Sequence, residues 1–418
     1  MKTKLILFLF AAISLSLQAQ KTTQNKKVVF IIVDGIAHDM LAKAQTPNLD
    51  KIAAKGGIAH SQVGGEKDGY SQTPTISAVG YNSLLTGTWV NKHNVYGNSI
   101  KQPNYNYPTI FRLFENTYPD GETAIFSTWE DNRTKLLGDG LVGTNFLKTT
   151  YSYDGFEKDT VAFPHDDERQ YIKHIDDKVA REAARYIYKN GPDLSWVYLE
   201  FSDDMGHKYG DGKQLYDAIS FEDGLVGLIY DAVDAREKQH GEDWLFVVTT
   251  DHGRSEETGK GHGGQSDRER STWIVMNKEG NSYFKNDTTA VVDIAPTIAG
   301  FLDIKTPHHV RQEWDGVPLI EDVAFTKLHA SHEGDTLTVS WKVGDAAPKK
   351  GELYLAASNN AGYGGEDKYT LLGKVDLKKE GATFTVNASS PILKILLKTQ
   401  NQYLNTWVVE SNNNKPSK

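Results

Sequence analysis

The segment Val28-Val29-Phe30-Ile31-Ile32-Val33-Asp34 is an apolar, β-prone run that ends in an aspartate. Two later runs have the same form, since residues 196–202 lead into Asp203 and residues 244–250 lead into Asp251. Near-continuous apolar runs of this length are typical of strands buried on both faces, as in a parallel sheet covered by helices. The three runs therefore predict buried strands of one parallel sheet.

Helical patterns lie between these runs. Residues 174–190 repeat apolar side chains every four positions, which is typical of one helix face, and residues 214–238 are similar. Strands that alternate with helices give a βαβ succession. The predicted fold class is α/β, with a largely parallel sheet sandwiched by helices over residues 26–322.

The character of the chain changes from about Val323. Short segments there alternate apolar and polar residues at period two, between turns rich in Gly, Asp and Asn. The clearest of them are residues 337–343, 352–355, 369–372, 384–386 and 392–397. They predict a small antiparallel β-sandwich of roughly seven strands over residues 323–418. Glycan binding and a lid or spacer role are both open for this domain.

The first twenty residues have the form of a signal peptide. A lysine-bearing start precedes the apolar run 5–17, and the small residue Ala19 follows it near the expected cleavage point. The run is too short to span a bilayer. We therefore expect residues 1–20 to be removed and the protein to be periplasmic or secreted, with no membrane partner. No cysteine is present, so no disulfide contributes to stability.

Composition and charge narrow the class of partner. Hydrophobic residues make up 39% of the chain, enough for a full core. The formal net charge is −9 and no basic stripe is evident, which argues against nucleic acid as a bulk partner.

Histidines accompany the aspartates that end the three runs. Ligands of such sheets bind outside the carboxyl ends of the strands. Several carboxylates delivered to that edge would repel one another unless a cation lay among them. The candidate ligands are Asp34, Asp203, His207, Asp251, His252 and His262. Oxygen and imidazole groups in this number predict a transition-metal site large enough for two ions.

A nucleophile candidate lies between the first two ligand groups. The stretch 73–87 is predicted to be a loop that enters a helix near Ser77. A hydroxyl at a helix N-terminus lies in the positive end of the helix dipole, which favours an alkoxide and an anionic substrate. Serine is also a common N-cap residue, and taken alone the stretch favours that simpler reading. The predicted metal ligands favour the nucleophile.

These motifs, in this order, resemble the alkaline phosphatase superfamily over residues 26–322. The likeness is greatest to its type I phosphodiesterase/nucleotide pyrophosphatase branch and to the related bacterial single-chain alkaline phosphatases. Each motif alone is weak, and the combination is specific. The motifs are Val33-Asp34-Gly35, Thr46-Pro47-Asn48-Leu49-Asp50, Ser77 with Leu85-Thr86-Gly87, Asp203-x-x-Gly206-His207, Asp251-His252-Gly253, Gly261-His262-Gly263, Asp293-Ile294-Ala295-Pro296-Thr297 and Asp315-Gly316.

The resemblance implies two divalent metals, usually zinc in this superfamily. One would bind Asp203, His207 and His262. The other would bind Asp34, Asp251 and His252, with the Ser77 oxygen as a further ligand. We expect the step from Asp203 to His207 to form a tight turn rather than a strand. Asn98 matches the asparagine that hydrogen-bonds a non-bridging phosphate oxygen in the superfamily.

The implied activity is hydrolysis of a small phosphate ester through a phosphoseryl intermediate. Two positions depart from the pattern. Related diesterases carry threonine where this chain has Ser77. The bacterial monoesterases carry a lysine, for the second phosphate charge, where this chain has Trp129 or Glu130. The absence of this lysine favours diesters as substrates, although Arg133 or Lys135 could supply the missing cation. Phosphomonoesterase activity is the alternative.

Three other readings fit the sequence less well. A sulfatase would need a Cys/Ser-x-Pro-x-Arg context, which residues 77–81 lack. A cofactor-independent phosphomutase would carry a large insertion after the nucleophile and no signal peptide. A non-catalytic secreted binding protein would not need a buried cluster of charges, whose cost is offset only by bound metal.

Overall fold

The computed structural model describes residues 25–387 and 390–409. The predicted signal peptide, residues 1–20, lies outside these ranges. Within them, no helix combines the length and the apolar character that crossing a membrane requires.

An eight-stranded sheet forms the centre of the larger part, in the order β4-β3-β5-β1-β6-β7-β2-β8. Strand β1 pairs in parallel with β5 on one side and with β6 on the other, and only β7 runs against its neighbours. The predicted largely parallel sheet is therefore confirmed. The strands are β1 (Lys26–Val33), β2 (Gly57–Gln62), β3 (Thr123–Ser127), β4 (Tyr151–Tyr153), β5 (Leu194–Leu199), β6 (Asp243–Thr249), β7 (Ser271–Met276) and β8 (Thr289–Ala290).

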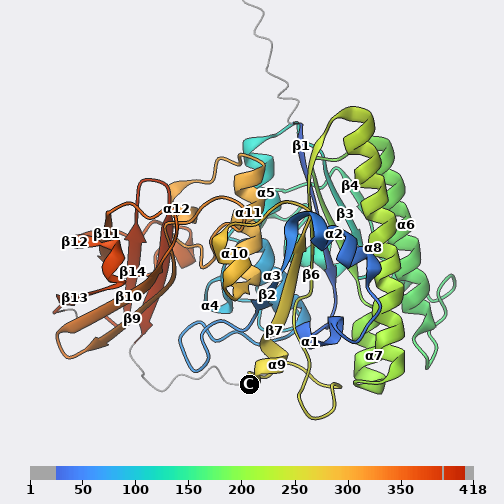
Figure 1. The fold of residues 1–418 in the computed structure, drawn as a ribbon, viewed down its shortest axis with the longest axis horizontal. Helices are drawn as coiled ribbons and strands as arrows, with labels where there is room; N and C mark the ends of the chain where they lie inside the picture. The colour runs from blue at the N-terminus through green and yellow to red at the C-terminus, as the bar shows by residue number, and fades with distance from the viewer. Residues whose placement is uncertain (1–24, 388–389, 410–418) are drawn as a thin grey trace, which may run out of the picture.

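Helices cover both faces of this sheet (Figure 1). Alternate side chains of β1 enter two different cores: Phe30 packs with residues of α3, α5 and α11, and Ile31 with residues of α6 and α8. Both side chains are fully buried, as the apolar run predicts. The helices are α1 (His38–Leu41), α2 (Pro47–Gly56), α3 (Ser77–Thr86), α4 (Val90–His93), α5 (Ile110–Thr117), α6 (Gln170–Asn190), α7 (Phe201–Tyr209), α8 (Lys213–His240), α9 (Asp267–Arg270), α10 (Ser282–Asn286), α11 (Ile294–Phe301) and α12 (His308–Arg311).

The strand predicted over residues 196–202 is shorter than expected. It ends at Leu199, and helix α7 starts two residues later, so that Asp203 and His207 lie on a helix. The prediction of a tight turn between these two residues is therefore wrong. Two buried carboxylates from other helices favour the helix start, because they accept its free backbone N–H groups.

The first of these carboxylates is Asp176 of α6, which accepts the N–H groups of Glu200 and Phe201. The second is Glu222 of α8, which accepts the N–H of Ser202 at 3.0 Å. Neither partner is close in sequence to α7.

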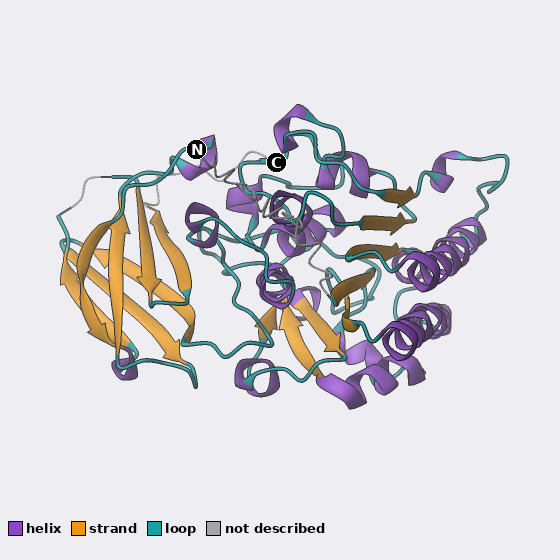
Figure 2. Cartoon of the chain, turned by 90° about the horizontal axis from the view of Figure 1, so that it is seen from above, coloured by secondary structure: helices purple, strands orange, loops and turns teal. Residues whose placement is uncertain are grey.

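The C-terminal part consists of two antiparallel sheets, β13-β10-β9 and β12-β11-β14-β15. Residues of both sheets share one apolar core, which includes Leu337, Leu353 and Ile395. The predicted small β-sandwich is confirmed, and Figure 2 shows it beside the helix-covered sheet. The domain boundary at residues 322/323 stays a prediction. The strands are β9 (Phe325–Glu333), β10 (Thr336–Val343), β11 (Lys350–Ala356), β12 (Thr370–Asp376), β13 (Gly381–Thr385), β14 (Ile392–Lys398) and β15 (Tyr403–Val409).

Candidate metal centre

Three strands bring the candidate ligands to one edge of the sheet. Val33 of β1 is level with Leu199 of β5, and Ile32 of β1 is level with Thr249 of β6. The segments that follow these strand ends carry Asp34, Asp203 and Asp251. The ligand groups therefore meet at the carboxyl edge, where such sheets bind their ligands.

The buried half of the site surrounds the His252 ring. Its Nε2 atom lies 3.2 Å from Asp251 Oδ2, 3.4 Å from Asp34 Oδ1 and 3.4 Å from Ser77 Oγ. His252 is fully buried, and the two aspartates are only 2% and 1% exposed. Four groups expected to act together on one metal thus lie in contact.

The hydrogen bonds of His252 show what kind of ligand this half requires. Its Nδ1 lies 2.9 Å from the Gly253 carbonyl oxygen, so Nδ1–H donates a hydrogen bond to that oxygen and Nε2 keeps a lone pair. The two carboxylate oxygens that face Nε2, Asp34 Oδ1 and Asp251 Oδ2, are buried and have no hydrogen-bond partner. Because buried acceptors that face one another are unfavourable without a cation, this donor set fits a metal ion.

The outer half of the site is open to solvent. His207 Nε2 lies 3.1 Å from Asp203 Oδ2 and 3.1 Å from His262 Nε2. The His262 Nδ1 atom is held 2.8 Å from the carbonyl of Thr75, which turns its Nε2 toward the cluster. His207 is exposed and His262 half-buried, so this half offers the way in for a substrate.

Asp203 belongs to both halves. One group that could hold a metal is Asp203, His207 and His262, and a second is Asp34, Asp203 and His252, with the ligand atoms of each within 4.8 Å of one another. The rings of His252 and His262 stack at 3.8 Å between the two groups. Sequence reasoning placed Asp203 with one metal only, whereas the geometry lets it contact both.

The cluster shifts the pKa of its members. Burial, with the charges of Asp251 and Asp203, raises the pKa of Asp34 well above its usual value. Burial likewise raises the pKa of Asp251 to about 7. For Asp203, burial acts in the same direction, but the His207 and Arg254 side chains hold its pKa well below the usual range. The metal-free site therefore retains protons that a cation would displace.

Sequence reasoning missed the groups that hold two of the carboxylates. Tyr81 and Tyr198 both donate to Asp34 Oδ2, and the distance from the Tyr198 hydroxyl is 2.7 Å. Arg254 Nη1 lies 2.5 Å from Asp203 Oδ1. The sequence contained two signals for these groups: Tyr81 lies one helical turn after Ser77, and Arg254 directly follows Asp251-His252-Gly253.

Ser77 is the first residue of α3, as predicted, and is 7% exposed. Asn98 lies beside it, since its Oδ1 accepts the backbone N–H of Ala78 at 3.0 Å and leaves the amide Nδ2 as a donor. Helix α3 approaches the ligand loop very closely, because a Cβ on Gly80 would lie 2.7 Å from the Asp251 carbonyl. The structure thus brings Ser77 and Asn98 to the same edge as the six ligands.

The four residues considered for the monoesterase lysine all have other contacts. Trp129 is half-buried and packs edge-on against Tyr81, with ring centroids 6.5 Å apart. Glu130 forms an ion pair with a lysine of the neighbouring loop. Arg133 is held at 2.6 Å by Asp154, and Lys135 at 2.7 Å by an aspartate one turn away. Both candidate cations are thus neutralised by carboxylates.

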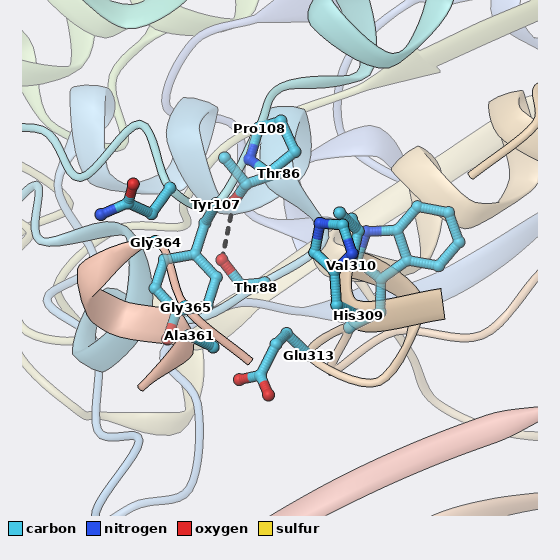
Figure 3. Close-up of a pocket in the computed structure, with 12 residues that line it drawn as sticks. Thr86, Thr88, Tyr107, Pro108, His309, Val310, Glu313, Ala361, Gly364 and Gly365 are labelled. Atoms are coloured by element: carbon cyan, nitrogen blue, oxygen red, sulfur yellow. Dashed lines mark hydrogen bonds between the residues drawn. The ribbon is translucent and has the colours of Figure 1, made fainter. Parts of the chain in front are cut away.

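A separate cavity of about 210 Å³ lies at the other end of α3 (Figure 3). Thr86, Tyr107 and Glu313 are among the residues that line it, and the Thr86 and Thr88 hydroxyls are 2.8 Å apart in its wall. Thr86 ends the helix that Ser77 begins, so about 13 Å of helix separates the cavity from the ligand cluster. The cavity is therefore separate from the candidate site.

Fold and site together define an alkaline-phosphatase-like protein. Residues 28–375 match the model of the type I phosphodiesterase / nucleotide pyrophosphatase family, and the chain belongs to this family.

Curated relatives are distant. Ectonucleotide pyrophosphatase/phosphodiesterase family member 7 of Rattus norvegicus is 23% identical over 242 residues, which are 55% of this chain and 50% of the relative. Family member 5 of Homo sapiens is 23% identical over 259 residues, or 61% of this chain and 50% of the relative. The chain thus spans about half the length of the curated relatives it matches.

Among solved structures, Ps i-CgsB in complex with k-i-k-neocarrahexaose is similar in fold. Its TM-score is 0.50 at 16% identity, and the match covers 78% of this chain and 83% of that one. At this identity the likeness shows the fold alone.

Proposed function

We propose that this protein is an exported, two-metal hydrolase of phosphoric esters that acts through a phosphoseryl intermediate and prefers diesters. Membership of the phosphodiesterase family supports the reaction class. The observation that carries the proposal is the cluster of buried, unpartnered acceptors around His252, with the Ser77 hydroxyl in contact with it.

The residues that would hold the metals follow from the two halves of the cluster. Asp203, His207 and His262 would bind the outer ion, and Asp34, Asp251 and His252 the inner one. The resemblance to the superfamily makes zinc the expected metal. When bound, such ions lower the pKa of a nearby hydroxyl and stabilise negative charge on phosphate oxygens.

The chain's own groups would perform the remaining steps. Ser77 Oγ, having lost its proton, attacks phosphorus in line, and the bond from phosphorus to the leaving oxygen breaks. Water then attacks the phosphorus of the phosphoserine, the bond from phosphorus to Ser77 Oγ breaks, and a proton from that water restores the Ser77 hydroxyl as the phosphate product leaves. The Asn98 Nδ2 group would donate to a non-bridging oxygen, which offsets charge as it develops.

The preference for diesters rests on the cations near the site. A monoester carries a second negative charge, and the position that would meet it has Trp129 or Glu130. The structure adds that Arg133 and Lys135, which could have replaced the lysine, are already paired with carboxylates. Monoesterase activity is therefore the less favoured alternative.

Two further points extend the proposal. Export to the periplasm or the cell exterior follows from the predicted signal peptide. A small phosphate ester is the proposed substrate. Glycan binding by the β-sandwich stays a prediction, which a direct binding measurement would test.

The test compares initial rates on a bis-aryl phosphodiester and an aryl phosphomonoester, with wild-type protein and Ser77→Ala in parallel. We expect the higher kcat/KM on the diester and loss of both activities in the variant. Higher kcat/KM on the monoester would overturn the diester preference. Absence of hydrolysis of both esters by metal-saturated wild-type protein would overturn the function as a whole.

A further inference from the structure

Arg254 is a fully buried cation beside Asp203, at the edge of the ligand cluster. Its Nη1 donates to Asp203 Oδ1 at 2.5 Å and to the Gly35 carbonyl at 3.3 Å. Its Nε donates to the Gly259 carbonyl, and its Nη2 to the Lys260 carbonyl at 3.2 Å. One guanidinium therefore contacts the strand end after β1, the helix α7 and the loop that leads to the last histidine.

Two glycines provide the space that this side chain fills. A Cβ on Gly35 would lie 2.5 Å from Arg254 Nη1, and a Cβ on Gly206 would lie 2.3 Å from its Cζ. Gly35 directly follows Asp34, and Gly206 directly precedes His207. The guanidinium is thus packed against the backbone of segments that carry ligands of both proposed metals.

The contacts leave Asp203 with a single free oxygen. Arg254 occupies Oδ1, and the other oxygen, Oδ2, lies 3.1 Å from His207 Nε2 on the metal side. A planar guanidinium suits this task, because its fixed fork of donors makes several directed hydrogen bonds at once and it stays charged when buried. Groups that orient metal ligands in this way raise metal affinity.

We propose that Arg254 is a positioning residue of the metal centre. It restricts Asp203 to coordination through Oδ2 and fixes the spacing of the three ligand-bearing segments. This inference rests on the proposed two-metal function. Charge alone would have the opposite effect on metal affinity, because a positive charge this close to the metals weakens cation binding by Coulomb repulsion.

The test uses Arg254→Met, Arg254→Lys and a matched control, with zinc alone as the probe. The control is Arg236→Met. Arg236 is also buried and donates to Glu242 at 2.8 Å, but it lies by the start of β6, at the sheet edge opposite the ligands. All three variants lose a buried arginine, and only two lose it at the metal centre.

Zinc dissociation constants are measured by competition with a chelating indicator, beside the melting temperature of each metal-free variant. We expect Arg254→Met to weaken at least one site by about 10- to 100-fold, and Arg254→Lys by less, because it keeps the charge without the fork. Arg236→Met should lower the melting temperature and leave both zinc constants unchanged.

Unchanged or tighter zinc binding in Arg254→Met would overturn the inference, and tighter binding would show that the charge acts by repulsion alone. If Arg254→Met does not fold, Arg254→Lys decides by the same criterion. Failure of wild-type protein to bind zinc would refute the proposed function instead, so the two failures are distinguishable.

Discussion

The chain buries two clusters of charged side chains, and they differ in how their charges are matched. One lies where strand β14 of the β-sandwich meets helix α4 and the loop that follows α12. There Lys92 lies 2.6 Å from Asp315, and Lys394 lies 2.6 Å from both Glu313 and Asp367. The other is the ligand cluster of three aspartates and three histidines, where one buried cation, Arg254, pairs with Asp203.

The first cluster has two lysines for three carboxylates, although burial still raises the pKa of Asp315. The second has one arginine for three aspartates. Burial alone would raise the pKa of Asp367, but the hydrogen bond from Lys394 leads to a lowered pKa. At the ligand cluster, burial raises the pKa of Asp251 to about 7. Buried charge by itself therefore does not mark a functional site. A functional site is marked instead by more buried acceptor atoms than the protein's own donors and cations can satisfy, so that an added cation is required.

The largest effect is expected at Ser77. Ser77→Ala should lower kcat by about 10⁴-fold or more, because the route through a phosphoryl enzyme is lost. Ser77→Thr should retain much more activity, since it keeps the hydroxyl. Steady-state kinetics on the bis-aryl diester measures both variants. Near-normal turnover in Ser77→Ala would place the nucleophile elsewhere.

A large effect of a different kind is expected at Lys394. Lys394→Met leaves two buried carboxylates without their partner and should cost about 3–5 kcal/mol of stability. Denaturant unfolding measures this cost. The folded fraction should still bind zinc with the wild-type constants, because this cluster is structural. Loss of zinc binding at wild-type stability would erase the distinction between the clusters.

Asn98 should have a smaller effect, mainly on catalysis. Asn98→Ala should lower kcat by about 10²- to 10³-fold, because it removes one donor to the phosphate oxygens. Zinc constants serve as the control and should stay close to wild type, whereas the melting temperature should fall slightly, because the Ala78 N–H loses its acceptor. A change in KM alone would mean that Asn98 binds ground state and transition state equally.

The smallest effect concerns pH. Asp251, with a pKa of about 7, is mostly protonated in the metal-free site at pH 6, and the raised pKa of Asp34 acts in the same direction. Zinc affinity should therefore decline as pH falls through 7. Calorimetry in two buffers should detect more protons released per zinc at pH 6 than at pH 8. Equal proton release at both values would contradict these pKa shifts.

The sequence predicted the fold where the signal is local. The apolar runs of β1 and β6 and the periodic patterns of α6 and α8 are visible within short stretches of sequence, and all four elements are present in the structure. The start of α7 could not be predicted, because it depends on Asp176 and Glu222 from other helices.

The same limit applies to the site. The six candidate ligands and Ser77 could be named as candidates because each belongs to a short motif at a segment end. Tyr81 and Arg254 could not, since their partners Asp34 and Asp203 lie 47 and 51 residues away. Contacts between such distant positions are set by packing, which no local pattern records.

Anomalous diffraction from crystals of the zinc-loaded protein shows whether the surplus of acceptors binds two metal ions. We expect two strong peaks, one among Asp203, His207 and His262 and one among Asp34, Asp251 and His252. The absence of both peaks, or strong peaks only at the lysine-containing cluster, would contradict this expectation.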